Sequence, residues 1–187
     1  MDVVELHRRA VAEFGARVAH VRDDQWAGPT PCAEWDVRAL VNHLVGENRW
    51  TAPLLAGRTI AEVGDRFDGD LLGSDARGAW ASASEEALAA VGEPGALDRT
   101  VHLSHGPAPA SEYVTQLFVD HLVHAWDLAR ATGVSERLDP DLVEACAAWF
   151  ADQEPFYREA GVIGPVVEVD EGADPQTALL ARFGRTA

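Results

Sequence analysis

The amino-acid sequence predicts an all-α protein: a four-helix bundle with a short accessory hairpin or loop and a small C-terminal helix. Apolar residues recur every three or four positions over long stretches, and glycine or proline separates these stretches. That period is typical of amphipathic helices packed around a shared core. The 187 residues are enough for one well-packed core and few for two. Because no internal repeat, heptad array or linker divides the chain, we expect one domain over residues 1–187.

The first two helices frame a turn-rich stretch. We expect the first helix over about residues 2–21, where five apolar residues fall on one side: Val3, Ala10, Phe14, Val18 and Val21. Residues 28–32 form turns, and Asp36 has the side chain of an N-cap. The second helix then covers about 37–56 and stops near Gly57.

The middle of the chain contains a third helix between two irregular segments. Residues 64–74 are rich in glycine and aspartate and predict a loop. The helix that follows covers about 75–91 and stops at Gly92. Residues 97–110 contain two short pieces, which predict either a small hairpin or an irregular connection.

Two further long helices complete the pattern. The fourth runs over about 111–132, with Ser111 as its cap and Gly133 directly after its end. The fifth begins at Asp139 and Pro140, a cap followed by proline at the first helical position, and runs to about 153 or further. The tail is then expected to be extended through 161–172 and to end in a short helix over about 174–184.

Composition excludes several classes of partner. The net charge of −16 would repel a nucleic-acid backbone or an anionic membrane surface. No apolar run approaches the roughly 20 residues that cross a bilayer, and the first residues lack a signal-peptide pattern, so we expect a soluble cytoplasmic protein. The two cysteines, Cys32 and Cys146, are then separate thiols. All 15 basic residues are arginine, which indicates the coding bias of a GC-rich bacterial genome.

The second predicted helix carries one inward-facing histidine. On a helical wheel His43 lies about 120° from the middle of the polar side, on the flank of the apolar stripe. A lone inward histidine is more often a hydrogen-bonded core residue than a metal ligand. His43 becomes informative only together with the fourth helix.

The fourth predicted helix is apolar around most of its circumference and keeps a narrow polar stripe. Asp120 and His124 lie in that stripe at a spacing of i, i+4, so both side chains lean over the same spot. Taken alone, the stripe could equally be a solvated helix edge. A bundle that brings His43 to the same point would supply two imidazoles and one carboxylate, a donor set that suits zinc, nickel or iron(II). We therefore predict His43, Asp120 and His124 as the ligands of one divalent metal ion.

Three segments resemble a known family: 29–44 (PTPCAEWDVRALVNHL), 68–73 (DGDLLG) and 120–133 (DHLVHAWDLARATG). They are similar to the mycothiol-dependent maleylpyruvate isomerase N-terminal-like proteins, which belong to the wider DinB-like superfamily of metal-binding four-helix bundles. The resemblance follows the order of nearly the whole chain. It implies a histidine on the second helix, and an acid or histidine followed by a histidine at i, i+4 on a later helix, which match His43, Asp120 and His124.

The resemblance also implies a function. Characterised relatives bind a divalent ion, commonly zinc, and use a low-molecular-weight thiol such as mycothiol. We therefore expect a metal-dependent enzyme that uses such a thiol in a transferase or isomerase reaction on a small electrophilic substrate. The isomerase itself has a further C-terminal domain that contributes to its active site, and this chain ends before one could form, so maleylpyruvate isomerisation itself is not expected.

Two other functions stay open for the same site. One is metal-assisted hydrolysis, and the other is a bundle that binds a metal or small molecule without catalysis. In each case the expected partner is a small molecule rather than a nucleic acid or a membrane. A homodimer is left open.

For several other residues near the predicted site, a structural role is the main interpretation. Glu47 follows His43 by one turn and could be a ligand or general base, although an exposed or arginine-paired acid is the commoner case. Asp127 could orient the His124 ring or be a surface acid. Cys32 is expected to be a small packing residue. His7 is expected at the core boundary, and His121 points about 100° away from Asp120, so it should not reach the same ion.

Overall fold

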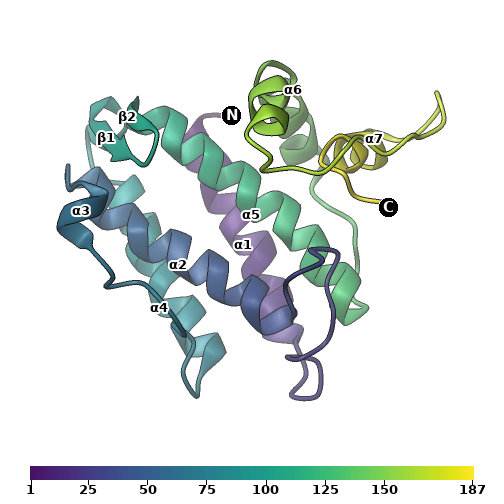
Figure 1. Ribbon diagram of the computed structural model, residues 1–187, viewed down its shortest axis with the longest axis horizontal. Coiled ribbons are helices and arrows are strands. Elements are labelled where there is room, and N and C mark those ends of the chain that lie inside the picture. Colours follow the sequence, from purple (N-terminus) through teal and green to yellow (C-terminus); the bar gives the residue numbers. More distant parts are fainter. The chain divides into compact units, whose positions relative to one another are not determined.

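The helices begin and end within a few residues of the predicted positions. The computed structural model describes residues 1–187, and it confirms the all-α class with one small two-stranded sheet (Figure 1). In chain order the elements are α1 (Val3–His20), α2 (Val37–Leu55), α3 (Ile60–Val63), α4 (Ala76–Val91), the 3-10 helix η1 (Ala96–Asp98), β1 (Thr100–Leu103), β2 (Gly106–Pro109), α5 (Ala110–Thr132), α6 (Pro140–Glu159) and α7 (Pro175–Arg182). The short elements α3 and η1 were not predicted.

Aspartate caps fix the starts of the long helices. The Asp36 carboxylate accepts a hydrogen bond from the Ala39 amide at 2.7 Å, which satisfies one of the free N–H groups of the first turn of α2. Asp2 and Asp75 cap α1 and α4 in the same way. The predicted Ser111 cap is wrong, because strand β2 leads directly into α5 and Pro109 occupies the N-cap position without a side-chain bond.

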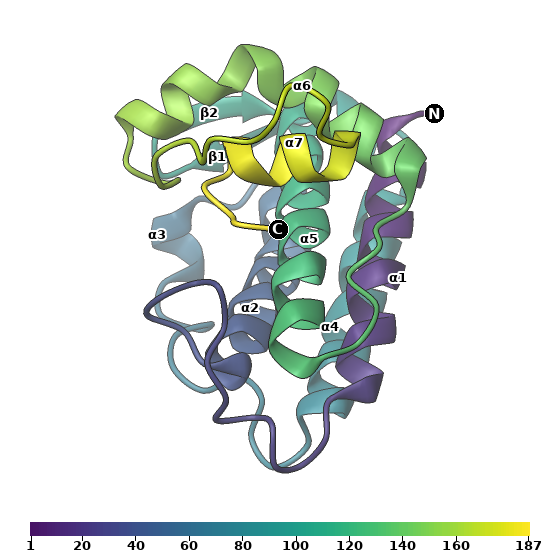
Figure 2. The same cartoon turned by 90° about the vertical axis from the view of Figure 1, so that its right-hand side faces the viewer.

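Four long helices, α1, α2, α4 and α5, form a bundle within residues 1–136. Helix α1 packs against α5 and α4, and α2 packs against the same two helices, so α1 and α2 lie across the diagonal from each other. Figure 2 shows these helices side by side along the bundle. Contacts made by α1 advance along α5 and the residues directly after it, from His7 beside His121 to Arg17 beside Ser135. The two helices are therefore parallel.

Helices α2 and α4 are also parallel, so residues 56–75 must return along the length of the bundle. This connection holds α3 and the predicted glycine- and aspartate-rich loop. The loop is attached to the start of α2, where Arg38 donates to both carboxylate oxygens of Asp70 at 2.8 Å. Asn42 donates to the Gly69 carbonyl at 3.0 Å and accepts from the Leu71 amide at 2.8 Å.

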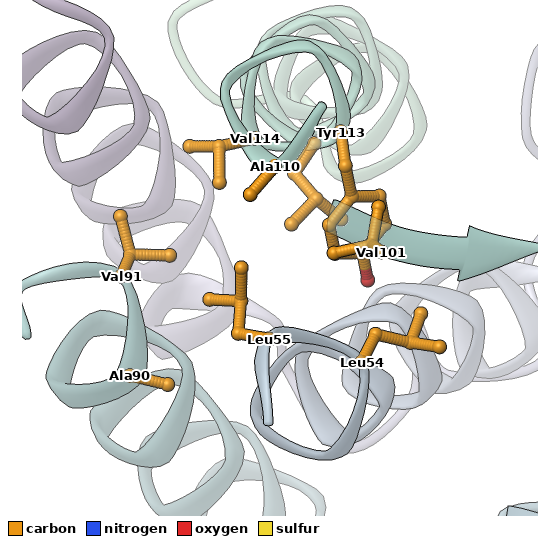
Figure 3. Close-up of a cluster of buried hydrophobic side chains, with 9 residues drawn as sticks. Leu54, Leu55, Ala90, Val91, Val101, Ala110, Tyr113 and Val114 are labelled. Atoms are coloured by element: carbon orange, nitrogen blue, oxygen red, sulfur yellow. The ribbon is translucent and has the colours of Figure 1, made fainter. Parts of the chain in front are cut away.

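The segment before α5 is the hairpin alternative of the two predicted forms. Strands β1 and β2 pair antiparallel, with Val101 opposite Ala108. A buried hydrophobic cluster lies at this end of the bundle and joins the hairpin to the ends of α2 and α4 and the start of α5 (Figure 3). Its members include Leu54, Leu55, Ala90, Val91, Val101, Ala110, Tyr113, Val114 and Leu117. This cluster fixes the depth at which α5 enters the bundle relative to α2.

The chain divides into two compact units, Met1–Glu136 and Arg137–Ala187. In the second unit α6 packs against α7, where the Phe150 and Phe183 rings stack with centroids 3.9 Å apart. Glu154 pairs with Arg182 at 2.7 Å and also with Arg158. The expectation of a single domain over 1–187 stays a prediction. None of the helices combines the length and apolar character needed to pass through a membrane.

Candidate metal centre

The structure brings the three predicted ligands together. His43 on α2 and the pair Asp120 and His124 on α5 offer one ligand atom each, all within 4.8 Å of one another. His43 Nε2 lies 3.0 Å from Asp120 Oδ2, and His124 Nε2 lies 3.3 Å from Asp120 Oδ1. The i, i+4 spacing on α5 and the packing of α2 against α5 together place the carboxylate between the two imidazoles.

This donor set fits a divalent metal ion. Tetrahedral zinc with bonds of about 2.0–2.2 Å keeps neighbouring ligand atoms roughly 3.3–3.6 Å apart. The 3.3 Å between His124 Nε2 and Asp120 Oδ1 lies in this range, and the 3.0 Å between His43 Nε2 and Asp120 Oδ2 is slightly shorter. The His43 and Asp120 side chains are 27% and 33% exposed, whereas His124 is 9% exposed. The side formed by His43 and Asp120 is therefore open to solvent, as a catalytic site with free coordination positions requires. That an ion binds here stays a prediction.

The charges of the three groups are strongly coupled. Loss of hydration favours the neutral form of each group, but mutual attraction outweighs it. The charge of Asp120 and the hydrogen bonds that the rings make to it raise the pKa of His43 above its ordinary value. The same two causes raise the pKa of His124 well above its ordinary value. The two imidazoles in turn hold the pKa of Asp120 well below its usual range. Asp120 is therefore ionised, and in the absence of an ion it accepts hydrogen bonds from both rings.

Asp127 orients the His124 ring from the side opposite Asp120. His124 Nδ1 lies 2.8 Å from Asp127 Oδ2, and the Asp127 side chain is completely buried. A hydrogen bond from Nδ1–H to this carboxylate directs Nε2 towards the ligand cluster. Of the two roles considered for Asp127, the structure shows the orienting one.

Trp35 forms a wall of the site. Its ring centroid lies 4.7 Å from that of His43 and 5.7 Å from that of His124. Trp35 belongs to the turn before α2, which is held in place because Thr30 Oγ1 donates to the Trp35 carbonyl at 2.7 Å. Sequence reasoning missed Trp35, and its position directly before the Asp36 cap is the only signal that could have drawn attention to it.

Cys32 also belongs to the site, contrary to the expected packing role. Its Sγ lies 3.3 Å from Asp127 Oδ2 and 3.9 Å from His124 Nδ1, and the residue is half-buried. The Cys32 amide donates to Thr30 Oγ1 at 3.1 Å, which fixes the turn. Cys32, His124 and Asp127 thus form a second group of potential metal ligands that shares His124 with the first.

Comparison with known proteins identifies the family. The model of the mycothiol maleylpyruvate isomerase N-terminal domain matches residues 7–129. The chain belongs to this family. Two proteins of Mycobacterium tuberculosis, from strains CDC 1551 / Oshkosh and ATCC 25618 / H37Rv and both described as uncharacterized, are each 40% identical over 166 residues. The alignment covers 86% of this chain and 85% of each relative. No solved structure matches the chain.

The family domain contains the whole site. Cys32, His43, Asp120, His124 and Asp127 all lie within the matched residues 7–129. Both groups of potential ligands are therefore built by the bundle itself. Residues 137–187, the second compact unit, lie outside the match.

Glu47 is a further acid close to His43, Asp120 and His124. It is half-buried and makes no ion pair with an arginine, so the expectation of an exposed or paired glutamate is wrong. Burial raises its pKa to about 7, and the negative charge of Asp120 contributes in the same direction. A carboxyl group with this pKa exchanges protons near neutral pH.

His7 and His121 lie away from the three predicted ligands. His121 is completely buried, and its Nδ1 donates to the Leu117 carbonyl at 2.7 Å. Its ring packs near His7, Phe14 and Trp80, which confirms that it faces away from Asp120. His7 is fully buried rather than at the core boundary, because α1 packs along the buried face of α5.

Proposed function

We propose that this protein is a metal-dependent enzyme that uses a low-molecular-weight thiol of the mycothiol type in a transferase or isomerase reaction on a small electrophilic substrate. The observation that carries the proposal is the convergence of His43, Asp120 and His124 at one partly open point of the bundle. Membership of the mycothiol maleylpyruvate isomerase N-terminal domain family supports the choice of thiol.

Some residues of the site would bind the ion, and another would orient one of its ligands. His43 Nε2, His124 Nε2 and a carboxylate oxygen of Asp120 would hold the ion, with zinc the best match and nickel or iron(II) as other candidates. When bound, such an ion favours the thiolate form of a coordinated thiol near neutral pH and holds its sulfur against the electrophile. Asp127 keeps the His124 ring in the productive orientation.

Trp35 and Glu47 would complete the site. The Trp35 ring covers one side of both imidazoles and excludes water there. This wall offers an apolar surface to the thiol or the substrate. Glu47, with its pKa of about 7, would accept or return a proton at its carboxylate as the substrate reacts.

The decisive experiment combines metal analysis with a turnover screen. Protein purified without a His-tag should contain about one divalent ion per chain, as expected for a single site with three protein ligands. Turnover of a panel of small electrophiles should require both the ion and mycothiol. His43→Ala should lose both metal and turnover, whereas His20→Ala, which changes an exposed histidine at the end of α1, should lose neither. Wild-type protein that takes up no zinc, nickel, iron or manganese would contradict the proposal.

Metal-assisted hydrolysis is the second candidate, and Glu47 is the observation that favours it. A half-buried carboxyl group with a pKa of about 7 beside an open metal site suits a base that takes a proton from attacking water. The same screen separates the two candidates. Turnover that proceeds without any thiol and falls in Glu47→Gln would support hydrolysis. Metal binding without turnover of any substrate would support a bundle with a binding role only.

A further inference from the structure

We propose a second cation site on the opposite side of the His124 ring, formed by Cys32 Sγ, His124 Nδ1 and Asp127 Oδ2, which takes a thiophilic divalent ion such as zinc or cadmium. The inference goes beyond the proposed function and does not depend on it. It concerns different atoms, because the first site uses Nε2 of His124 and the second uses Nδ1.

The separations of the three atoms are those of a metal ligand set. His124 Nδ1 and Asp127 Oδ2 lie 2.8 Å apart, Cys32 Sγ and Asp127 Oδ2 lie 3.3 Å apart, and Cys32 Sγ and His124 Nδ1 lie 3.9 Å apart. Around tetrahedral zinc, with metal–sulfur bonds of about 2.3 Å, such pairs lie roughly 3.3–3.6 Å apart. Adjustments of about 0.3–0.8 Å in the Nδ1–Oδ2 and Sγ–Nδ1 separations would bring all three atoms to a common ion.

The chemistry of the donors selects the kind of ion. A thiolate and an imidazole prefer zinc and other thiophilic ions over magnesium or calcium, which take oxygen ligands. Asp127 also contributes a completely buried carboxylate to the cluster. A buried carboxylate gains from a cation placed against it.

The second site is accessible because Cys32 lies in the turn before α2 and is only half-buried. Asp127 is fixed on α5 in the core of the bundle, whereas half-buried Cys32 belongs to the turn before α2. An ion can therefore arrive from the side of this turn and be closed in by the cysteine. Its binding displaces the Nδ1 proton that is donated to Asp127, and this proton is released to solvent. When both sites are filled, His124 would therefore bridge the two ions as an imidazolate, with one ion on each ring nitrogen.

Cadmium titration of the full-length, metal-free protein tests the proposal. Bound cadmium is measured by equilibrium dialysis, and sulfur coordination by thiolate-to-metal absorption in the ultraviolet. At saturating cadmium the wild-type protein should bind about two ions per chain, one more than the single ion expected in the protein as purified, and one of the two should show thiolate absorption. Cys32→Ser and Cys32→Ala should each lose the absorption and about one ion. Cys146→Ser is the matched control, because that thiol is buried in α6 and burial raises its pKa to about 12.

Asp120→Asn separates this site from the first one. It removes a ligand of the first site only, so the thiolate absorption should persist at about one bound ion. Persistence of the absorption in Asp120→Asn supports the second site even if the first site binds no cadmium in either the wild type or the variant. Wild-type protein that shows no thiolate absorption at saturation overturns the proposal. Absorption that Cys32→Ser and Asp120→Asn each abolish also overturns it, because Cys32 would then belong to one shared site.

Discussion

The carboxylate of Asp127 lies 2.8 Å from Nδ1 of His124, one turn further along α5 and fully buried. Asp120 lies one turn before His124 and faces Nε2 at 3.3 Å. A single helix therefore supplies two of the predicted ligands, Asp120 and His124, and also Asp127, which orients the His124 ring. The second imidazole, His43, is the one part of the site that depends on packing between α2 and α5.

Asp127→Asn should weaken zinc binding by about 10–100-fold without unfolding the bundle, since partners of ligating histidines tune metal affinity by this amount. The neutral amide oxygen of asparagine accepts the Nδ1–H hydrogen bond more weakly than the carboxylate does, so the His124 ring is held less firmly in its orientation. The dissociation constant is measured by competition with a coloured chelator. Asp68→Asn, at an exposed position in the loop before α4, is the matched control. Equal affinity in Asp127→Asn and the wild type would show that the contact does not support metal binding.

Asp120→Asn should weaken metal binding more severely, because it removes a ligand and the negative charge between the two imidazoles. Asp120→His should retain the metal. A carboxylate leaves the bound cation a net charge of about +1 rather than the +2 of an all-histidine site, so a bound thiol or water keeps a higher pKa. The pH–activity midpoint should therefore move downward in Asp120→His. Tight binding by Asp120→Asn across the pH range from 5 to 8 would exclude Asp120 as a ligand.

The pH dependence of metal binding follows from the raised pKa values of the two ligand histidines. Both imidazoles must be deprotonated to bind, so zinc affinity should fall as pH decreases. Because the pKa of His43 is raised and that of His124 is raised well above the ordinary value, the fall should begin above pH 6.5 in the wild type. Isothermal titration with zinc at several pH values measures the profile. A fall confined to pH values well below 6.5 would mean that Asp120 does not hold the two rings protonated in the metal-free protein.

The convergence of His43, Asp120 and His124 could be predicted because helix periodicity fixes the direction of side chains. A spacing of four residues places Asp120 and His124 together whatever surrounds the helix, and the apolar stripe of α2 points His43 inward. Cys32 and Trp35 could not be predicted in this way. They lie in a turn whose shape depends on hydrogen bonds to Thr30, and a turn has no period from which direction can be read.

The same contrast holds for the fold. The long helices were predicted because caps such as Asp36, and the left-handed glycine Gly133 with φ of +72°, mark their ends. Helix α3 is only four residues long and has no apolar period to detect, although Thr59 and Glu62 form a capping box that is visible in the sequence. Glu47 was misjudged because its burial depends on the depth at which α5 packs against α2, which no local pattern specifies.

Leu55→Ala should lower the free energy of unfolding by about 2–5 kcal/mol, the usual cost of removing a buried leucine side chain. Leu55 is almost completely buried in the cluster that joins α2, α4, α5 and the hairpin (Figure 3). Urea unfolding followed by circular dichroism measures the loss. Leu71→Ala, at a half-exposed position in the loop before α4, is the control and should cost less. Equal losses for the two variants would show that the cluster does not stabilise the bundle.

His7 should make the bundle sensitive to acid, since burial lowers the pKa of its imidazole to about 3 and the neighbouring His121 contributes. Both ring nitrogens of His7 are buried without a hydrogen-bond partner, and its ring meets that of His121 edge-on at 5.6 Å. In the unfolded chain the same imidazole has a pKa of about 6.5. As pH falls below that value, His7 binds a proton in the unfolded state but not in the folded state. The free energy of unfolding therefore decreases from about pH 6.5 downward. At pH 5 the loss from this one residue should be about 2 kcal/mol.

His7→Leu should remove this sensitivity while retaining an apolar side chain of similar volume between α1 and α5. The free energy of unfolding, measured in urea at pH 7 and pH 5, should fall less between the two values in His7→Leu than in the wild type. The ligand histidines have raised pKa values and act in the opposite sense, so only the difference between variant and wild type isolates His7. His20→Leu, which makes the same substitution at an exposed histidine of the same helix, is the matched control. If His7→Leu loses as much stability at pH 5 as the wild type does, the His7 imidazole is already charged in the folded protein, and a polar partner within the bundle must balance that charge.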